Sequence, residues 1–115
     1  ALVLATAKPI ESAERVLVKA GLIDLFDAVS GSELDLLRQG KPEVIAHGIT
    51  LIGRDPGSVR ATMIGDRKED ILGATAHGFD SIGVLRGYAD DGELAAAGPT
   101  HLVGGADEIR PLIGL

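Results

Sequence analysis

The chain has 115 residues and a formal net charge of −6, and 45% of its residues are hydrophobic while only 3% are aromatic. This length suits one small domain with a single core, and a core of Ala, Val, Ile and Leu is usual for parallel sheets covered by helices. The acidic balance argues against nucleic acid as a partner. The absence of cysteine excludes disulfides and thiolate metal sites, and no apolar run approaches the ~20 residues that span a bilayer. Because no signal peptide is recognisable either, we expect a cytoplasmic protein without membrane or nucleic-acid partners.

The first strand and the first helix are predicted at the start of the chain. Residues 1–5 form a short apolar run that predicts a buried strand. Pro9 suits a first helical turn, and apolar residues at helical spacing predict a helix over 10–20 that ends at Gly21. Thr6 is therefore expected in the turn between them, where it could cap the helix or belong to a site at the end of the strand.

The next segment is predicted to contain a strand, a loop and a helix. The strand is expected around 26–29, and the polar, glycine-bounded residues 31–40 favour an exposed loop. Lys41 then opens a helix that we expect to run to about residue 53. A lysine at a helix start is usually solvated, yet a cation opposing the helix dipole hints at an anionic partner.

The central feature of the sequence is the stretch 61–70, ATMIGDRKED. A short apolar run stopped by glycine predicts a buried strand, and a helix is expected over 67–77. Asp66 would lie at the carboxyl end of that strand, where open α/β sheets bind their ligands, and Asp70 about one helical turn further on. Two carboxylates there suit a hard cation such as Mg2+, although an aspartate after a strand is also a common helix cap.

The rest of the chain continues the alternation of strands and helices. We expect a strand over 79–85, a short helix over 90–97, a strand over 101–103 and a helix over 106–113. Strands separated by helices require crossover connections and parallel pairing. The fold class predicted from the sequence is therefore a doubly wound α/β unit.

Three polar features would meet at the carboxyl edge of such a sheet. They are the hydroxyl of Thr6, the ammonium of Lys41 and the carboxylates of Asp66 and Asp70. Each of them is weak by itself. Together they are what phosphoryl transfer needs, because a hydroxyl holds phosphate oxygens, a lysine offsets negative charge and a metal screens the reacting oxygens.

At these residues the chain resembles the haloacid-dehalogenase-like (HAD) phosphatases, in particular the phosphoglycolate phosphatases and their relatives. Residues 2–9 are similar to the second motif of the family, a strand that ends in Thr or Ser. Lys41-Pro42 is similar to the third motif, and residues 64–70 are similar to the fourth, acidic motif. The three motifs occur in the family's order and the resemblance covers nearly the whole chain.

The resemblance implies a three-layer, Rossmann-like core and a Mg2+-dependent phosphomonoesterase that acts on a small phosphorylated metabolite through an aspartyl-phosphate. Thr6 would hydrogen-bond the transferring phosphoryl group, and Lys41 would steady both that group and the nucleophile. Asp66 and Asp70 would form the metal site. The neighbouring Ala7 and Lys8 are further candidates for substrate contacts.

The first motif of the family, an Asp-x-Asp pair after a strand, is not found in the 115 residues. In the family's sheet that strand lies between the Thr6 strand and the Asp66 strand, and the cap domain follows it. The single methionine is Met63 and the chain opens directly on a strand. We therefore expect residues 1–115 to be the C-terminal part of a phosphatase core, inactive without the nucleophile strand and cap.

Two alternatives to an enzyme segment share some of these residues. A non-catalytic domain of the same fold could bind a phosphorylated ligand or a protein partner, but a binding scaffold needs no metal site. A receiver-like signalling domain also combines aspartates with a threonine and a lysine. Such a domain has its acidic pair early and its lysine late, whereas here Lys41 precedes Asp66.

Overall fold

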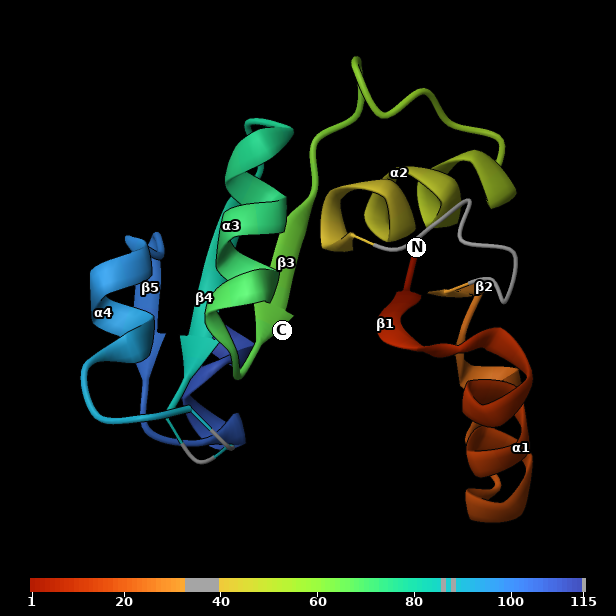
Figure 1. Cartoon of the computed structure of the whole chain (residues 1–115), viewed down its shortest axis with the longest axis horizontal. Helices are drawn as coiled ribbons and strands as arrows, with labels where there is room; N and C mark the ends of the chain where they lie inside the picture. The colour runs from red at the N-terminus through yellow and green to blue at the C-terminus, as the bar shows by residue number, and fades with distance from the viewer. Residues whose placement is uncertain (33–39, 86, 88, 115) are drawn as a thin grey trace. The chain divides into compact units, whose positions relative to one another are not determined.

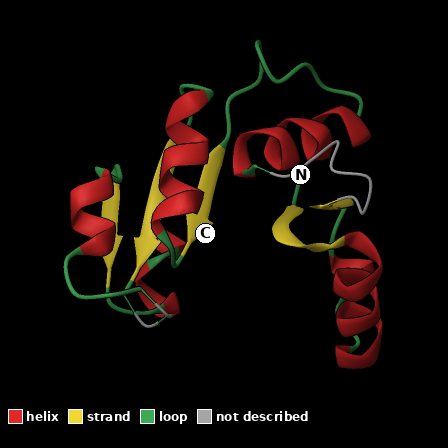
Figure 2. Ribbon diagram, in the orientation of Figure 1, coloured by secondary structure: helices red, strands yellow, loops and turns green. Residues whose placement is uncertain are grey.

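The computed structural model of the protein describes residues 1–32, 40–85, 87 and 89–114. The chain forms two compact units, Ala1–Val59 and Arg60–Leu115. Helices and strands alternate within each of them (Figures 1 and 2). Among the described residues, no helix combines the length and the apolar character that crossing a bilayer requires.

The first unit contains a parallel pair of strands with a helix after each. Its elements are β1 (Val3–Pro9), α1 (Ile10–Ala20), the short 3-10 helix η1 (Ile23–Leu25), β2 (Ala28–Ser32) and α2 (Lys41–Leu51). The strands pair regularly from Val3 with Ala28 to Ala5 with Ser30. The register then shifts, so that Pro9 pairs with Ser32.

Helix α2 packs closely across both strands of this unit. Ser30 is fully buried and its Oγ donates a hydrogen bond to the Val44 carbonyl oxygen, at 2.6 Å. Gly48 brings the helix backbone so near the sheet that a Cβ added there would lie 2.8 Å from Val3 Cγ1. A residue without a side chain is therefore needed at position 48 for this close approach.

The second unit is a three-stranded parallel sheet in the order β3-β4-β5. Its elements are β3 (Thr62–Gly65), α3 (Lys68–Ala76), β4 (Asp80–Val84), α4 (Glu93–Ala97), β5 (His101–Val103), and the 3-10 helices η2 (Ala106–Glu108) and η3 (Arg110–Ile113). Its fully buried side chains come from α3, β4 and α4, and they include Ile71, Ile82 and Leu94. Each of the two units therefore has a small aliphatic core of its own.

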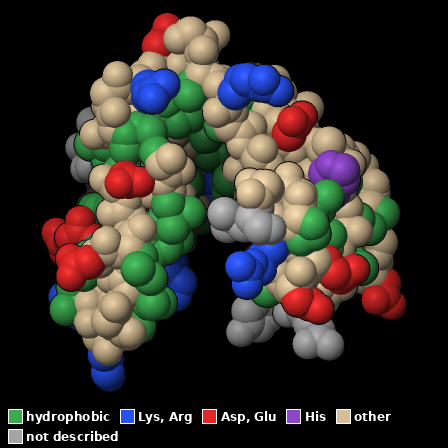
Figure 3. Space-filling view, turned by 180° about the vertical axis from the view of Figure 1, so that it is seen from behind, with side chains coloured by type: hydrophobic (Ala, Val, Ile, Leu, Met, Phe, Trp, Pro, Cys, Tyr) green, Lys and Arg blue, Asp and Glu red, His purple; other side chains and the backbone are tan. Residues whose placement is uncertain are grey.

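Large apolar side chains also remain on the surface of both units (Figure 3). The most exposed of them are Leu2, Val16, Val18, Leu22, Leu25, Leu51, Ile64, Leu72, Leu85, Leu102, Leu112 and Ile113. On α1 the buried side chains are Ala13 and Leu17, whereas Val16 and Val18 are exposed.

The structure confirms the predicted α/β class with parallel pairing, and two elements have the predicted bounds, α1 and β5. The strands form two sheets, β1-β2 and β3-β4-β5. Thr6 lies within β1, where a turn was predicted, because the strand continues through its register shift to Pro9. The last predicted helix is instead the pair of 3-10 turns η2 and η3, since Pro111 lacks the N–H that a continuous helix needs there. Most of the predicted loop, residues 33–39, lies outside the described part of the chain.

Candidate functional site

Asp66 follows β3 directly and is half-buried. The loop after β4 approaches it closely at Gly87, where an added Cβ would overlap the Asp66 side chain. Glycine at position 87 therefore leaves the room that the Asp66 carboxylate occupies. The sequence prediction for Asp66, at the carboxyl end of a parallel strand, agrees with its place in the structure.

Asp70 lies in the first turn of α3 and is buried, with 8% of its surface exposed. Its Oδ2 accepts hydrogen bonds from the backbone N–H groups of Asp66, at 3.2 Å, and Arg67, at 3.3 Å. A carboxylate in this position also complements the helix dipole. Asp70 therefore caps the N-terminus of α3 and also holds the backbone that carries Asp66.

A second carboxylate, from Glu93 at the start of α4, holds the same turn. Glu93 Oε2 accepts hydrogen bonds from Arg67 Nε and from the Lys68 backbone N–H, both at 2.9 Å. The Arg67 guanidinium, followed by the Lys68 N–H, lowers the pKa of the Glu93 carboxyl to about 2. The same ion pair raises the pKa of Arg67. The turn after β3 is thus bound to α4 by a charged group that is ionised at all ordinary pH values.

The donor set at this strand end fits a hard cation. Carboxylate oxygens are the ligands that Mg2+ prefers, and Mg2+ is commonly held by one or two carboxylates, with waters and phosphate oxygens completing its coordination. Among the described residues, His, Asp and Glu side chains do not gather in any group of three or more that could hold a metal. Asp66 and Asp70 are the carboxylates at this strand end that could hold such a cation.

The predicted residues of the first unit lie at the end of β1. Thr6 is half-buried, and its Oγ1 accepts a hydrogen bond of 3.2 Å from the Lys8 backbone N–H. Helix α1 begins after Pro9 without a side-chain cap, so Thr6 is not its cap. Ala7 and Lys8 are both exposed beside it. The hydroxyl of Thr6 binds the backbone of β1 where its register shifts, and its contact with phosphate remains a prediction.

Lys41, the first residue of α2, reaches back to this strand end. Its Nζ donates a hydrogen bond of 3.1 Å to the carbonyl oxygen of Ala5, the residue before Thr6. The structure therefore brings Lys41 and Thr6 to one strand end within the first unit, although 35 positions separate them in the sequence. It brings Asp66 and Asp70 together within the second unit in the same way.

Arg67, Gly87 and Glu93 all belong to the stretches that resemble the family, and Gly87 follows a strand where it could border the site or simply belong to a loop. Nothing in the sequence predicts a contact between Arg67 and Glu93. Glu93 resembles any acidic residue in a first helical turn, and its partner Arg67 is 26 positions away. Gly87 resembles an ordinary loop glycine.

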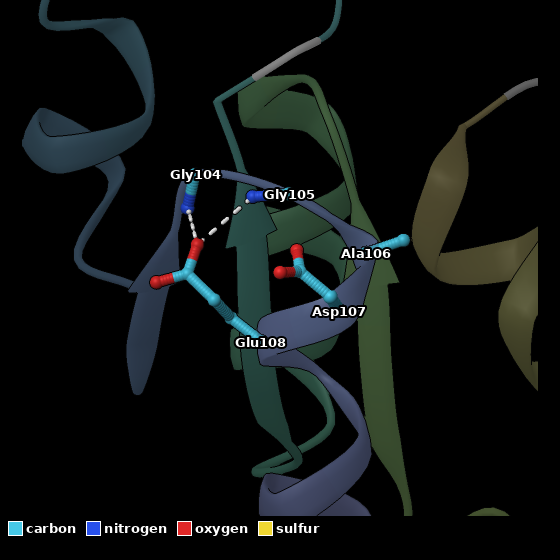
Figure 4. A pocket seen from close by; sticks show the side chains of 5 residues that line it. All are labelled: Gly104, Gly105, Ala106, Asp107 and Glu108. Atoms are coloured by element: carbon cyan, nitrogen blue, oxygen red, sulfur yellow. Dashed lines mark hydrogen bonds between the residues drawn. The ribbon is translucent and has the colours of Figure 1, made fainter.

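A surface pocket elsewhere in the second unit does not coincide with the predicted residues. It is lined by Gly104, Gly105, Ala106, Asp107 and Glu108 (Figure 4). Glu108 Oε2 accepts hydrogen bonds from the backbone N–H groups of Gly104, at 2.6 Å, and Gly105, at 3.0 Å. Its carboxylate therefore caps the short helix η2, and we assign no function to this pocket.

Parallel strands alternating with helices, with polar residues at the end of β1 in one unit and of β3 in the other, define a Rossmann-like α/β protein. Comparison with known proteins identifies the family. Residues 38–109 match the family model described as HAD-hydrolase-like. The chain therefore belongs to the HAD-like hydrolases, as the sequence motifs predicted.

Several curated relatives and solved structures are similar to most of the chain. It is 36% identical over 112 residues to a 5'-nucleotidase of Pseudomonas aeruginosa, covering 97% of this chain and 50% of that protein. It is 33% identical over 116 residues to the tyrosine-protein kinase PtkA of Mycobacterium tuberculosis, covering 99% and 39%. The crystal structure of a "predicted phosphatase" from Clostridium acetobutylicum superposes with a TM-score of 0.88 at 36% identity, covering 97% and 51%.

The resemblance to phosphoglycolate phosphatases is also confirmed. The chain is 31% identical over 111 residues to the phosphoglycolate phosphatase of Neisseria gonorrhoeae, covering 94% of this chain and 46% of that protein. The chain thus spans half or less of the length of these curated relatives.

Proposed function

We propose that the protein is a Mg2+-dependent phosphomonoesterase of the phosphoglycolate phosphatase-like type. The observation that carries this proposal is the position of Asp66, half-buried at the carboxyl end of β3 on a turn held by two carboxylates, in a chain of the HAD-like family. A predicted cytoplasmic location is consistent with a small phosphorylated metabolite as substrate.

Asp66 and Asp70 are the residues that would hold Mg2+ in this proposal. When bound, Mg2+ would offset the negative charge of the phosphoryl group and of the oxygens around it. Asp70 has a second task, because its Oδ2 binds two backbone N–H groups of the turn. We therefore assign Asp66 as the principal ligand and Asp70 as a ligand, directly or through water, that also orients it.

Thr6 and Lys41 are the residues proposed to contact the phosphoryl group. The Thr6 hydroxyl would donate a hydrogen bond to a phosphoryl oxygen, and the Lys41 ammonium would offset charge on the phosphoryl group and the nucleophile. Ala7, through its backbone N–H, and Lys8 are proposed to bind the same phosphate. The hydrogen bond from Lys41 to Ala5 supports this assignment, since it keeps the ammonium beside the strand end that carries Thr6.

The nucleophile is proposed to be an aspartate outside these 115 residues, since they contain no Asp-x-Asp pair. The resemblance implies a strand that pairs with both the Thr6 strand and the Asp66 strand. Among the described residues, β1 pairs only with β2, and β3 pairs with β4 alone. Each of these strands therefore has one side open for a further strand, which supports the proposal.

The test is a phosphatase assay of the whole protein. Phosphoglycolate, nucleoside 5'-monophosphates and pyrophosphate are the first substrates to compare, with and without added Mg2+. We expect turnover of at least one phosphate ester that requires Mg2+, and an Asp66→Asn variant that lacks it. Turnover that is equal in the presence of excess chelator would contradict the proposal.

Two other activities would give different results in the same experiments. The similarity to the kinase PtkA suggests a second candidate activity, the transfer of phosphate to tyrosine. That activity would require ATP and would leave phosphotyrosine on a protein acceptor. A non-catalytic domain would bind phosphate esters without releasing phosphate. Parallel assays of phosphate release, phosphotyrosine formation and ligand binding separate the three.

A further inference from the structure

The Glu93 carboxylate has a richer set of partners than its place at the start of a five-residue helix requires. Besides the bonds of its Oε2 to Arg67 Nε and the Lys68 N–H, its Oε1 accepts longer bonds from Arg67 Nη2 and the Asp90 N–H, both at 3.4 Å. The Glu93 side chain is only 8% exposed, whereas that of Arg67 is 44% exposed. The carboxylate is therefore the enclosed member of this ion pair.

A simple helix cap does not account for this arrangement. The bond that belongs to the start of α4 itself, from the Asp90 N–H, is among the two longest. The two shortest bonds, at 2.9 Å, go to the turn between β3 and α3, 25 and 26 positions away. The bonds from Arg67 also join two opposite charges, which makes them stronger than a bond from a neutral N–H. Most of the hydrogen bonding of Glu93 is therefore directed at that turn.

This is the turn that carries Asp66, and its backbone is bound at three successive positions. The N–H groups of Asp66 and Arg67 donate to Asp70, and the N–H group of Lys68 donates to Glu93. These groups are consequently engaged within the protein and are not offered to an anion. Fixing three consecutive peptide groups also fixes the direction in which the Asp66 side chain leaves the backbone.

We infer that Glu93 is a positioning residue for Asp66, holding the turn 66–68 in the conformation that binds Mg2+. This rests on the proposed function, in which Asp66 is a metal ligand. Partners that orient a metal ligand typically change metal affinity 10- to 100-fold when they are removed. Without Glu93 the turn would keep its hydrogen bonds to Asp70 but lose the bonds that the Arg67 side chain and the Lys68 N–H make to Glu93. Metal binding would then have to order the turn, which would weaken the affinity for Mg2+.

The test measures Mg2+ affinity and turnover in the whole protein, with p-nitrophenyl phosphate as a general ester probe. Glu93→Ala is expected to raise the Mg2+ concentration for half-maximal activity about tenfold, with most of kcat recovered at saturating Mg2+ and KM for the ester unchanged. Direct titration of Mg2+ by calorimetry should show the same loss of affinity. Glu93→Gln keeps an acceptor oxygen, so it should retain part of the Mg2+ affinity that Glu93→Ala loses.

Glu108→Ala is the matched control, because Glu108 also accepts two backbone N–H bonds in the second unit but holds a different turn. It should lower thermal stability and leave the Mg2+ requirement unchanged. A Glu93→Ala protein that loses stability while keeping the wild-type Mg2+ affinity would overturn the inference alone. A wild-type protein that neither binds nor needs Mg2+ would overturn the proposed function together with it.

Discussion

The two strand ends that carry the predicted site are held in different ways. At the end of β3, two carboxylates bind three successive backbone N–H groups and one guanidinium. At the end of β1, a single ammonium reaches a carbonyl oxygen and a single hydroxyl accepts a backbone N–H. The end of β3 therefore surrounds its carboxylates with several hydrogen-bond donors. The end of β1 instead carries the Lys41 ammonium and the Thr6 hydroxyl, beside the register shift of the strand.

The difference follows from the charges involved. Asp66, Asp70 and Glu93 are all acidic, and like charges held near one another destabilise the fold unless donors compensate them. Backbone N–H groups and Arg67 supply that compensation even before any metal binds. At the end of β1, the Lys41 ammonium donates to the Ala5 carbonyl oxygen, and no cluster of carboxylates has to be offset there. The acidic end therefore has to be built more rigidly than the basic end.

The largest effect is expected when the negative charge of Asp66 is removed. In the whole protein, Asp66→Asn should lower Mg2+-dependent turnover about 1000-fold, because it removes the proposed principal ligand. The fold should remain, since the side chain is half-buried in a polar turn. Circular dichroism and thermal unfolding check the fold, and Asp91→Asn, an exposed aspartate of the same unit, is the control. Wild-type activity of Asp66→Asn would refute the metal assignment.

The basic end should respond less strongly. Lys41→Met keeps most of the side chain's length but removes the ammonium that binds Ala5. We expect turnover to fall about 100-fold. The Mg2+ concentration for half-maximal activity should not change, because Lys41 is proposed to contact the phosphoryl group and not the metal. Lys19→Met, at the exposed end of α1, is the matched control. A changed Mg2+ requirement would contradict this division of roles.

Crowding the acidic end should have a smaller effect than removing its charge. A Cβ at Gly87 would overlap the Asp66 side chain, so Gly87→Ala should displace that carboxylate. We expect Mg2+ affinity to fall about tenfold. Gly57→Ala is the control, because a Cβ there would meet only ordinary contacts, the nearest at 3.5 Å. If Gly87→Ala and Gly57→Ala had the same Mg2+ affinity, the close approach of Gly87 to Asp66 would not matter for metal binding.

A purely structural change in the first unit should affect stability alone. Ser30→Ala removes the buried hydrogen bond to the Val44 carbonyl, which joins α2 to β2. The free energy of unfolding should fall by about 1 kcal/mol. Urea unfolding of the whole protein measures this, with the exposed Ser58→Ala as reference. A loss of Mg2+ affinity in Ser30→Ala would contradict the assignment of metal binding to β3.

The smallest expected effect is a dependence of stability on pH. The folded-state pKa of Glu93 is about 2, below its ordinary value of 4.5, because of the Arg67 and Lys68 bonds. Its stabilising contribution is therefore complete above about pH 4.5 and is lost as the pH falls towards 2. The difference in melting temperature between wild type and Glu93→Gln should be present at pH 7 and shrink over that interval. A difference independent of pH would mean that the charge of Glu93 is not what matters.

Local signals in the sequence predicted much of the fold. The bounds of α1 follow from Pro9 and from Gly21, which adopts a left-handed conformation. The strand before Asp66 follows from a short apolar run that stops at Gly65. What the sequence did not reveal depends on contacts between distant residues, such as Arg67 with Glu93, or on empty space, such as that beside Gly87.

The one-sided pairing of β3 has a practical consequence for handling the protein. Ile64 is an apolar residue with 39% of its surface exposed, and it lies on a strand whose second edge has no partner among the described residues. Such an edge offers a row of unpaired N–H and carbonyl groups to any extended peptide, including another copy of itself. These 115 residues expressed alone should therefore self-associate as their concentration rises, and a charged residue in place of Ile64 should keep them dispersed.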